Sequence, residues 1–284
     1  MSKMARQADR PRQARPVQFA VCVLLLATLV LAACSSAVTT PSEPVTLRIA
    51  GSSSLKPVLE ELAAAYQLGH PQTLVSVLGS GTAIGIQELR GKESDLAAVS
   101  WKPGTEKLPD DLQSIPVARD GLAIIVNPQN TITNVTSLQL RALFRGETLD
   151  WGTVGGSGGG PVVISREDGA GSRAAFEALA MGGERVTLNA LVMPSSQAVV
   201  DYVAAHRNAV GYVSTGVLTD TVRAVPLEEV APNGATLRSG EYRLGRVLYL
   251  YAPQPASSEV RAFIDFVLSP AGQAIVARRL VPVR

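Results

Sequence analysis

From Val45 onward, short apolar runs alternate with longer segments in which apolar residues recur every three or four positions. The first pattern predicts buried β-strands and the second predicts amphipathic helices. In this half of the chain, strands are predicted at 45–50, 73–78, 95–100, 115–119 and 121–127, and helices at 57–68 and 83–91. Strands interleaved with helices at this spacing predict an α/β fold with a mixed, mostly parallel sheet and helices on both faces.

The second half of the chain repeats the pattern. Helices are predicted at 137–146, 173–181 and 197–206, strands at 161–165 and 209–214, and two C-terminal helices within 257–280 that are interrupted at Pro270. Two α/β units joined by extended segments predict two lobes with a ligand cleft between them. We expect the crossovers near Val126 and Thr221, so that lobe I comprises 45–126 and 221–284 and lobe II comprises 127–220.

The N-terminus has the pattern of an export signal. A basic lead precedes the apolar run 19–34, which is too short to span a bilayer comfortably and ends in small residues. The sequence LAAC at 31–34 resembles the lipobox of bacterial lipoproteins, which implies a signal peptide over 1–33 and lipidation of Cys34. The alternative is an ordinary signal peptide with a chance cysteine. Cys22 leaves with the signal, so the exported chain has no partner for a disulfide.

The excess of basic residues in the chain lies within this predicted signal. The whole chain carries a net charge of +2, but the chain after residue 33 keeps 21 basic and 23 acidic residues, a net charge of about −2. Such a body lacks the basic excess of a nucleic-acid-binding protein. Residues 35–44 are rich in Ser, Thr and Pro, which is typical of a flexible tether between a lipid anchor and a folded body.

Three loops, each between a predicted strand and a predicted helix, are rich in Gly and Ser. They are AGSSSLKP at 50–57, LGSGTAIG at 78–85 and REDGAGSR at 166–173. Ligands of open α/β sheets bind where such loops follow the carboxyl ends of strands. Unpaired backbone N–H groups at helix starts, with hydroxyls and Arg166 beside them, favour an oxyanion ligand. The alternative for Arg166 is a surface salt bridge with Glu167 or Asp168.

Five segments resemble the phosphate-binding lipoproteins of bacterial phosphate ABC transporters. They are GSSSLKP, GSGTAIGIQEL, SLQLRALFRGETLDWGTVGG, REDGAGSRAAFE and AVGYVS, in that order from Val45 to the C-terminus. The resemblance implies the two-lobed periplasmic-binding-protein fold and a monomer that captures inorganic phosphate for a permease, without a cofactor. It also implies an extracytoplasmic location on the membrane surface. Trp151 in the third segment is expected to anchor packing rather than to bind ligand.

The resemblance also implies a set of ligand contacts. The first loop would supply Ser54 and the N–H of Leu55, the second Ser80 and Gly81, and the third Arg166, Ala170, Gly171 and Ser172, with Ser100 and Trp101 at the end of the strand 95–100. Arg166 can make a bidentate contact with two oxygens, which a lysine cannot.

Two positions depart from the family pattern. Ala170 stands where the family has a serine, which removes a hydroxyl donor. Trp101 stands where some relatives have an aspartate that accepts the proton of hydrogen phosphate and others an arginine. Glu167 or Asp168 is an alternative proton acceptor, and Trp101 is either a lid over the ligand or a packing residue at the cleft edge. Other oxyanions, such as sulfate or molybdate, therefore stay open as ligands.

Other functions are less well supported by the sequence. Ser157 lies in a G-x-S-x-G match, but a glycine run replaces the strand and helix that a hydrolase needs, so no enzyme activity is expected. His70 and His206 have no neighbours that suggest a metal site. The segment GSGTAIG lacks the dinucleotide-binding spacing. A lipoprotein that has kept the fold for a sensing or structural role, without a transport ligand, is the remaining alternative.

Overall fold

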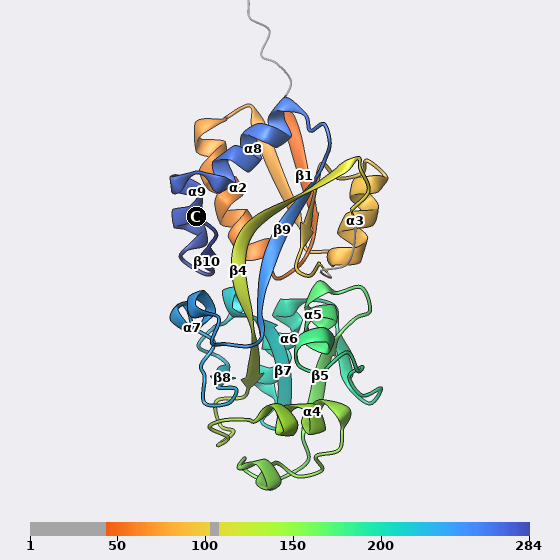
Figure 1. Ribbon diagram of the computed structural model, residues 1–284, viewed down its shortest axis with the longest axis vertical. Helices are drawn as coiled ribbons and strands as arrows, with labels where there is room; N and C mark the ends of the chain where they lie inside the picture. The colour runs from red at the N-terminus through yellow and green to blue at the C-terminus, as the bar shows by residue number, and fades with distance from the viewer. Residues whose placement is uncertain (1–43, 103–107) are drawn as a thin grey trace, which may run out of the picture. The chain divides into compact units, whose positions relative to one another are not determined.

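The computed structural model describes residues 44–102 and 108–284, in which all of the long strands lie in one sheet (Figure 1). The expected signal peptide, Cys34 and the tether up to residue 43 lie outside the described residues. The order of the main strands is β2 (Thr73–Leu78), β1 (Val45–Gly51), β3 (Leu96–Val99), β9 (Gly245–Pro253), β4 (Leu112–Val126), β7 (Ala209–Ser214), β5 (Val162–Arg166) and β6 (Leu191–Met193). In the described ranges, no helix is long and apolar enough to cross a membrane.

The sheet is parallel at its two ends and antiparallel in its middle. Strand β1 pairs in parallel with β2 and β3, and β5 pairs in parallel with β6 and β7. Between these groups, β4 and β9 run side by side in opposite directions (Figure 1). The predicted strands 115–119 and 121–127 are both part of β4. A short β10 (Val281–Pro282) and β8 (Arg223–Val225) also pair with β4.

Helices cover both faces of the first part of the sheet, as predicted. On one face, α2 (Lys56–Gly69), α8 (Ser258–Leu268) and α9 (Pro270–Val276) share a core with β1 and β9. On the other face, α3 (Thr82–Arg90) contributes Leu89 to a smaller core with β3. Two of these helices are those predicted around Pro270, which is the first residue of α9.

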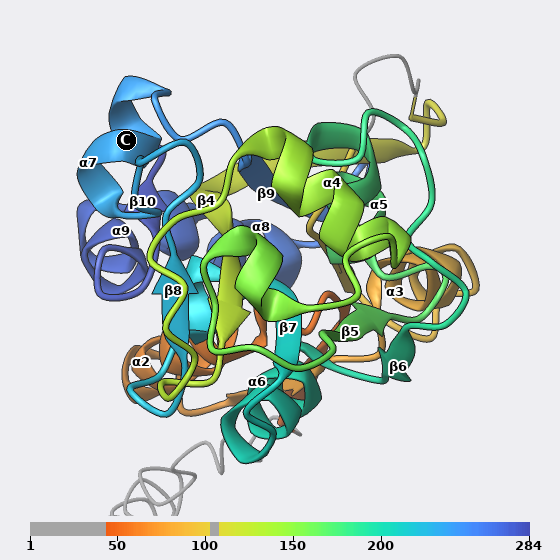
Figure 2. The same cartoon turned by 90° about the horizontal axis from the view of Figure 1, so that it is seen from below.

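The second part of the sheet is covered in the same way. Helices α4 (Ser137–Arg145), α5 (Gly171–Leu179) and α7 (Gly234–Ser239) share one core, and α6 (Ser196–Ala205) packs on the opposite face of the sheet through Val199 and Val203 (Figure 2). Trp151 begins the short helix η1 (Trp151–Val154) and lies buried in the first of these cores. Its Nε1 donates to the carbonyl of Asn208 over 3.1 Å, so the packing role expected for Trp151 is confirmed.

Strand pairing favours crossovers that differ from the expected ones. Strand β4 pairs with β9 from Leu112 to Gly121 and then turns to β7 and β8. The chain returns only at Gly245, because Leu227, Leu237 and Leu244 all pack in the core of α4 and α5. We therefore use lobe I for 44–121 with 245–284, and lobe II for 122–244. On this division the second crossover lies near Gly245, whereas Thr221 was expected, because β8 pairs with β4 in lobe II.

Candidate anion-binding site

Loops from both lobes meet at the carboxyl ends of the parallel strands. Lobe I contributes the loops that follow β1, β2 and β3, and lobe II contributes those that follow β5 and β6. The N–H of Ala83 at the start of α3 donates to the carbonyl of Gly169 in the opposite lobe over 3.0 Å. A Cβ atom on Gly171 would lie 2.5 Å from the Oγ of Ser100 and 2.6 Å from the Oγ1 of Thr82. Only glycine lets the start of α5 approach lobe I this closely.

Arg166, the last residue of β5, lies at the centre of this contact with an exposed fraction of 2%. Its Nη1 donates to the hydroxyls of Ser53 in lobe I (3.1 Å), Ser196 in lobe II (3.1 Å) and Ser172 (3.4 Å). A serine hydroxyl can accept from a guanidinium and donate its own proton elsewhere. The three hydroxyls and Nη1 therefore form a group of donors that an oxyanion can use.

The two carboxylates of the acidic pair Glu167 and Asp168 have different surroundings. Glu167 forms two hydrogen bonds with Arg166, Nε to Oε2 at 2.8 Å and Nη2 to Oε1 at 2.7 Å. The salt bridge considered in the sequence thus exists, but its arginine is buried rather than on the surface. Asp168 has a side chain that is 75% exposed and pairs with Arg173 and Arg185. Of the two carboxylates, Glu167 is the one that lies at the cleft.

The first predicted loop reaches the site through its serines. The Oγ of Ser54 lies 3.4 Å from the Oγ of Ser196 and accepts a hydrogen bond from Nη2 of Arg246 over 3.2 Å. Ser54 therefore lies beside a hydroxyl that contacts Arg166. The N–H of Leu55 donates to the carbonyl of Ser52 over 3.1 Å, which closes a turn just before α2. This N–H is therefore already engaged within its own loop.

The second loop supplies a hydroxyl and a close approach. The Oγ of Ser80 is buried and has no hydrogen-bond partner among the described residues. Gly81 has a φ of +99°, and its N–H donates to the carbonyl of Gly51 over 2.7 Å. A Cβ at this position would lie 3.4 Å from Oε1 of Glu167. Ser80 thus keeps a free donor beside the cleft, whereas the N–H of Gly81 shapes the loop.

The remaining predicted residues lie at the contact between the lobes. Ser100 is buried with its Oγ 3.3 Å from that of Thr82. Trp101 follows it and packs against the core of lobe II, so it crosses from lobe I to the opposite lobe. Ala170 is the buried N-cap residue of α5 and offers no side-chain hydrogen bond to the helix. Gly171 and Ser172 are the first two residues of α5 and are buried beside Arg166.

Two features of the site were not predicted. Ser53 and Ser196 both contact Arg166, and Ser196 begins α6 after Ser195, whose Oγ caps the helix by accepting from the N–H of Ala198 over 3.0 Å. A Pro-Ser-Ser sequence before an amphipathic segment is a helix-start signal that could have drawn attention to this loop.

The second unpredicted feature is a buried ion pair. Asp120 in β4 and Arg246 in β9 lie opposite each other in the strand register, and both side chains are fully buried. Oδ2 of Asp120 accepts a hydrogen bond from Nε of Arg246 (2.9 Å) and lies 2.8 Å from Nη2 in the ion pair. Oδ1 accepts from Ser214 and from the N–H and hydroxyl of Thr215, over 2.8 to 3.0 Å. Burial lowers the pKa of Arg246, and the charge of Asp120 opposes that shift.

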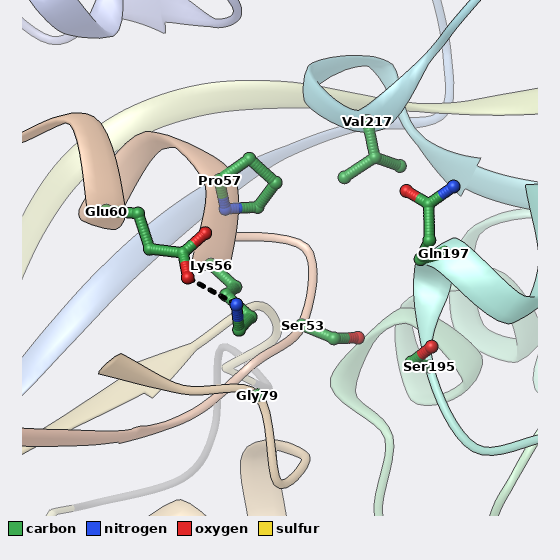
Figure 3. A pocket seen from close by; sticks show the side chains of 8 residues that line it. All are labelled: Ser53, Lys56, Pro57, Glu60, Gly79, Ser195, Gln197 and Val217. Carbon is green, nitrogen blue, oxygen red and sulfur yellow. Dashed lines mark hydrogen bonds and ion pairs between the residues drawn. The ribbon is translucent and has the colours of Figure 1, made fainter. Parts of the chain in front are cut away.

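A pocket opens beside Ser53 and Ser195 (Figure 3). It has a volume of about 390 Å³, and Ser53 lies on one side of it, with the N-cap residue Ser195 and Gln197 at the start of α6 on the other. Lys56 and Glu60, an ion pair on α2, line its lobe I side. Ser53 therefore joins the open pocket to the buried group around Arg166.

Ser157, His70 and His206, which were considered for other chemistries, have hydrogen-bond or stacking partners of their own. Ser157 lies in the loop after η1, where its hydroxyl donates to the carbonyl of Gln129 over 3.3 Å. His70 stacks on Tyr66 and His206 stacks on Tyr202, with ring centroids 3.9 and 3.8 Å apart. Within 44–102 and 108–284, no group of three or more His, Cys, Asp or Glu residues could hold a metal ion.

Two lobes built on a mixed sheet, with a buried arginine and hydroxyls from both lobes in the cleft, define a solute-binding protein of the periplasmic type. The PBP superfamily domain matches residues 38–271. The phosphate-binding protein PstS of Pseudomonas aeruginosa is 30% identical over 263 residues, which cover 84% of this chain and 73% of that protein. PstS of Borreliella burgdorferi is 25% identical over 240 residues, 80% and 86% of the two chains.

Solved structures agree with these relatives. A substrate-binding protein of the phosphate ABC transporter type from Clostridium perfringens, solved with bound phosphate, superposes with a TM-score of 0.80 at 29% identity and covers 84% of this chain and 100% of that one. An ABC-type phosphate transport receptor from Vibrio cholerae gives 0.68 at 30% identity, covering 83% and 99%. The chain belongs to the PstS-like phosphate-binding proteins of the PBP superfamily.

Proposed function

We propose that this protein captures inorganic phosphate between its two lobes and delivers it to the permease of an ABC importer. The observation that carries the proposal is the position of Arg166, which is buried and bonded through Nη1 to serine hydroxyls of both lobes. An arginine with several hydroxyls provides the directional donors that a tetrahedral oxyanion needs. The names of the related proteins support phosphate as that oxyanion.

Binding would use groups that already meet in the closed cleft. The hydroxyls of Ser53, Ser54, Ser172 and Ser196 can turn their protons toward an anion while their oxygens face a guanidinium. Ser80 would add another hydroxyl from lobe I. Because these groups come from loops on separate lobes, the anion would favour the closed arrangement over an open one.

The proton of hydrogen phosphate also needs an acceptor. Glu167 is the carboxylate closest to the predicted role, since it pairs with Arg166 and lies beside Gly81. Its two oxygens already accept from Arg166, but a carboxylate oxygen can accept more than one hydrogen bond. Some relatives accept this proton with an aspartate at the position of Trp101. We propose that Glu167, together with the serine oxygens, accepts the proton in this protein.

The protein is further proposed to act outside the cytoplasmic membrane as a lipid-anchored monomer. The LAAC sequence that ends at Cys34 and the Ser/Thr/Pro-rich segment after it support this proposal. Labelled palmitate should be incorporated into the protein in bacterial cells, and the Cys34→Ala variant should incorporate none and leave the membrane fraction. A Cys22→Ala variant is the matched control, because this cysteine lies within the signal.

The ligand is tested by calorimetric titration and thermal melting with phosphate, arsenate, sulfate and molybdate. A ligand present at a hundred times its Kd should stabilise the folded protein by about 2.7 kcal/mol, which is a clear shift in a melt. We expect phosphate and arsenate to raise the melting temperature most. A larger rise in melting temperature with sulfate or molybdate would identify that anion, rather than phosphate, as the ligand. If no anion changed the melting temperature, the binding function would be refuted.

A further inference from the structure

The side chain of Arg246 holds a charged hydrogen-bond donor that the site described so far leaves unused. Its exposed fraction is 0%, and Nη1 has no hydrogen-bond partner among the described residues. Burying a charged donor without a partner is costly, and native proteins rarely retain such a group without a use for it. The other two nitrogens of the guanidinium are engaged: Nε donates to Asp120, and Nη2 lies 2.8 Å from the same carboxylate oxygen.

The geometry of the guanidinium shows where the unused donor faces. An arginine has two edges that can grip oxygens, one formed by Nε and Nη2 and the other by Nη2 and Nη1. Asp120 occupies the first edge. Nη2 also donates to the Oγ of Ser54 over 3.2 Å, so the second edge faces Ser54.

Ser54 connects this edge to Arg166. The Oγ of Ser54 lies 3.4 Å from the Oγ of Ser196, which in turn lies 3.1 Å from Nη1 of Arg166. Two guanidinium groups, one from each lobe, thus face each other with two serine hydroxyls between them. Each has its own carboxylate on the far edge, Glu167 for Arg166 and Asp120 for Arg246.

We propose that Arg246 is a second guanidinium ligand of the bound oxyanion and grips it through the edge formed by Nη2 and Nη1. The inference rests on the proposed function, because it places the anion at the serines between the two arginines. It assigns to lobe I a guanidinium ligand, which neither Gly/Ser-rich loop of lobe I contains. Arg166 and Arg246 would then hold the anion from opposite lobes, so that closing the cleft brings both charges onto it.

The first test is a phosphate titration of the purified protein and its Arg246→Lys variant, with folding checked by circular dichroism. The lysine keeps a positive charge for Asp120 but loses the second edge. We expect a roughly tenfold to hundredfold loss of affinity, the size of one or two charge-assisted hydrogen bonds. Arg223→Lys is the matched control, because Arg223 is a partly buried arginine of β8 that donates to the carbonyls of Asn130 and Ile132.

A second variant separates direct contact from an effect through Ser54. If Arg246 only positions Ser54, the Arg246→Lys change should have no further effect in a Ser54→Ala background. We expect it to weaken phosphate binding there as well. If Arg246→Lys does not fold, the Asp120→Asn/Arg246→Gln double variant removes both buried charges together and is expected to lose affinity by a similar factor.

A crystal structure of the parent protein with phosphate requires no variant. Nη1 of Arg246 is expected within about 3.2 Å of a phosphate oxygen. A distance above about 4 Å, or a folded Arg246→Lys variant with the affinity of the parent, would overturn this inference while leaving the proposed function intact. Failure of the parent protein itself to bind phosphate would instead overturn the proposed function, and this inference with it.

Discussion

The carboxylate of Glu167 engages two nitrogens of its neighbour Arg166, Nε at 2.8 Å and Nη2 at 2.7 Å. This pairing neutralises much of the arginine's charge and fixes the plane of its guanidinium. It leaves Nη1 directed at the hydroxyls of Ser53, Ser172 and Ser196. The arginine is thus oriented before it meets a ligand, which lowers the entropy that binding must overcome.

Replacing Arg166 with lysine should weaken phosphate binding more than removing any one hydroxyl. A lysine cannot pair with Glu167 through two nitrogens and reach the serines at the same time. We expect Arg166→Lys to raise the Kd for phosphate by about a hundredfold or more and Ser172→Ala by roughly tenfold, as typical for charged and neutral hydrogen bonds. Calorimetric titration measures both, and an equal loss in the two variants would contradict the central place of Arg166.

A methyl group on Gly171 should keep the lobes apart. Its Cβ would lie 2.5 Å from the Oγ of Ser100, and both Ser100 and Thr82 are buried with little room to move. We therefore expect Gly171→Ala to bind phosphate at least tenfold more weakly while its melting temperature without ligand changes little. Gly69→Ala is the control, since a Cβ there meets nothing within 4 Å. Small-angle X-ray scattering should show that Gly171→Ala no longer contracts with phosphate.

Trp101 should report closure through its fluorescence. It extends from the end of β3 in lobe I but packs against the core of lobe II, so its surroundings change when the lobes separate. The protein has two tryptophans, and the other, Trp151, is buried within lobe II. Phosphate should therefore change the emission of a Trp151→Phe variant and leave that of Trp101→Phe unaltered. A phosphate response that depends on Trp151 instead would show that Trp101 does not sense closure.

Tyr212 should make the fold sensitive to strong alkali. Burial raises the pKa of its hydroxyl to about 12, although the hydrogen bond to Ser165 opposes the shift. The folded pKa lies above the unfolded value of 10, so the contribution of the neutral phenol is fully present below pH 10 and is lost as the pH rises toward 12. Urea unfolding at pH 9 to 12 should show a steeper loss in the parent than in Tyr212→Phe. Identical slopes would refute this assignment.

Local pattern was sufficient to predict most of the fold. The strand at 73–78 has the predicted bounds, and the helices after β1 and β2 differ from prediction by a residue or two at their ends, because apolar periodicity and flanking turn residues define them locally. Strand β9 was not predicted, although VLYLYA within it is rich in β-branched and aromatic residues. Without that strand, Arg246 had no location in the predicted fold.

The site was predictable where its residues lie in one loop and not where folding joins distant ones. Arg166 and Ser172 are six positions apart and share a recognisable motif. Ser53 and Ser196 are 143 positions apart, and Asp120 and Arg246 are 126 apart. No local pattern links such pairs, because the β4–β9 register and the meeting of the lobes bring them together. The choice between Glu167 and Asp168 likewise depended on side-chain direction.

The register of β4 and β9 has a mechanical consequence. Gly121 and Gly245 are partners in the strand register, and Asp120 and Arg246 are the next pair along. Glycine has no Cβ to restrict its backbone angles, so we expect this pair to be the pivot of the two strands joining the lobes. The adjacent ion pair braces that point and reaches Ser54 in the cleft. The expected pivot and the proposed anion ligand Arg246 are therefore neighbouring positions of β9, and we expect a change at one to affect the other.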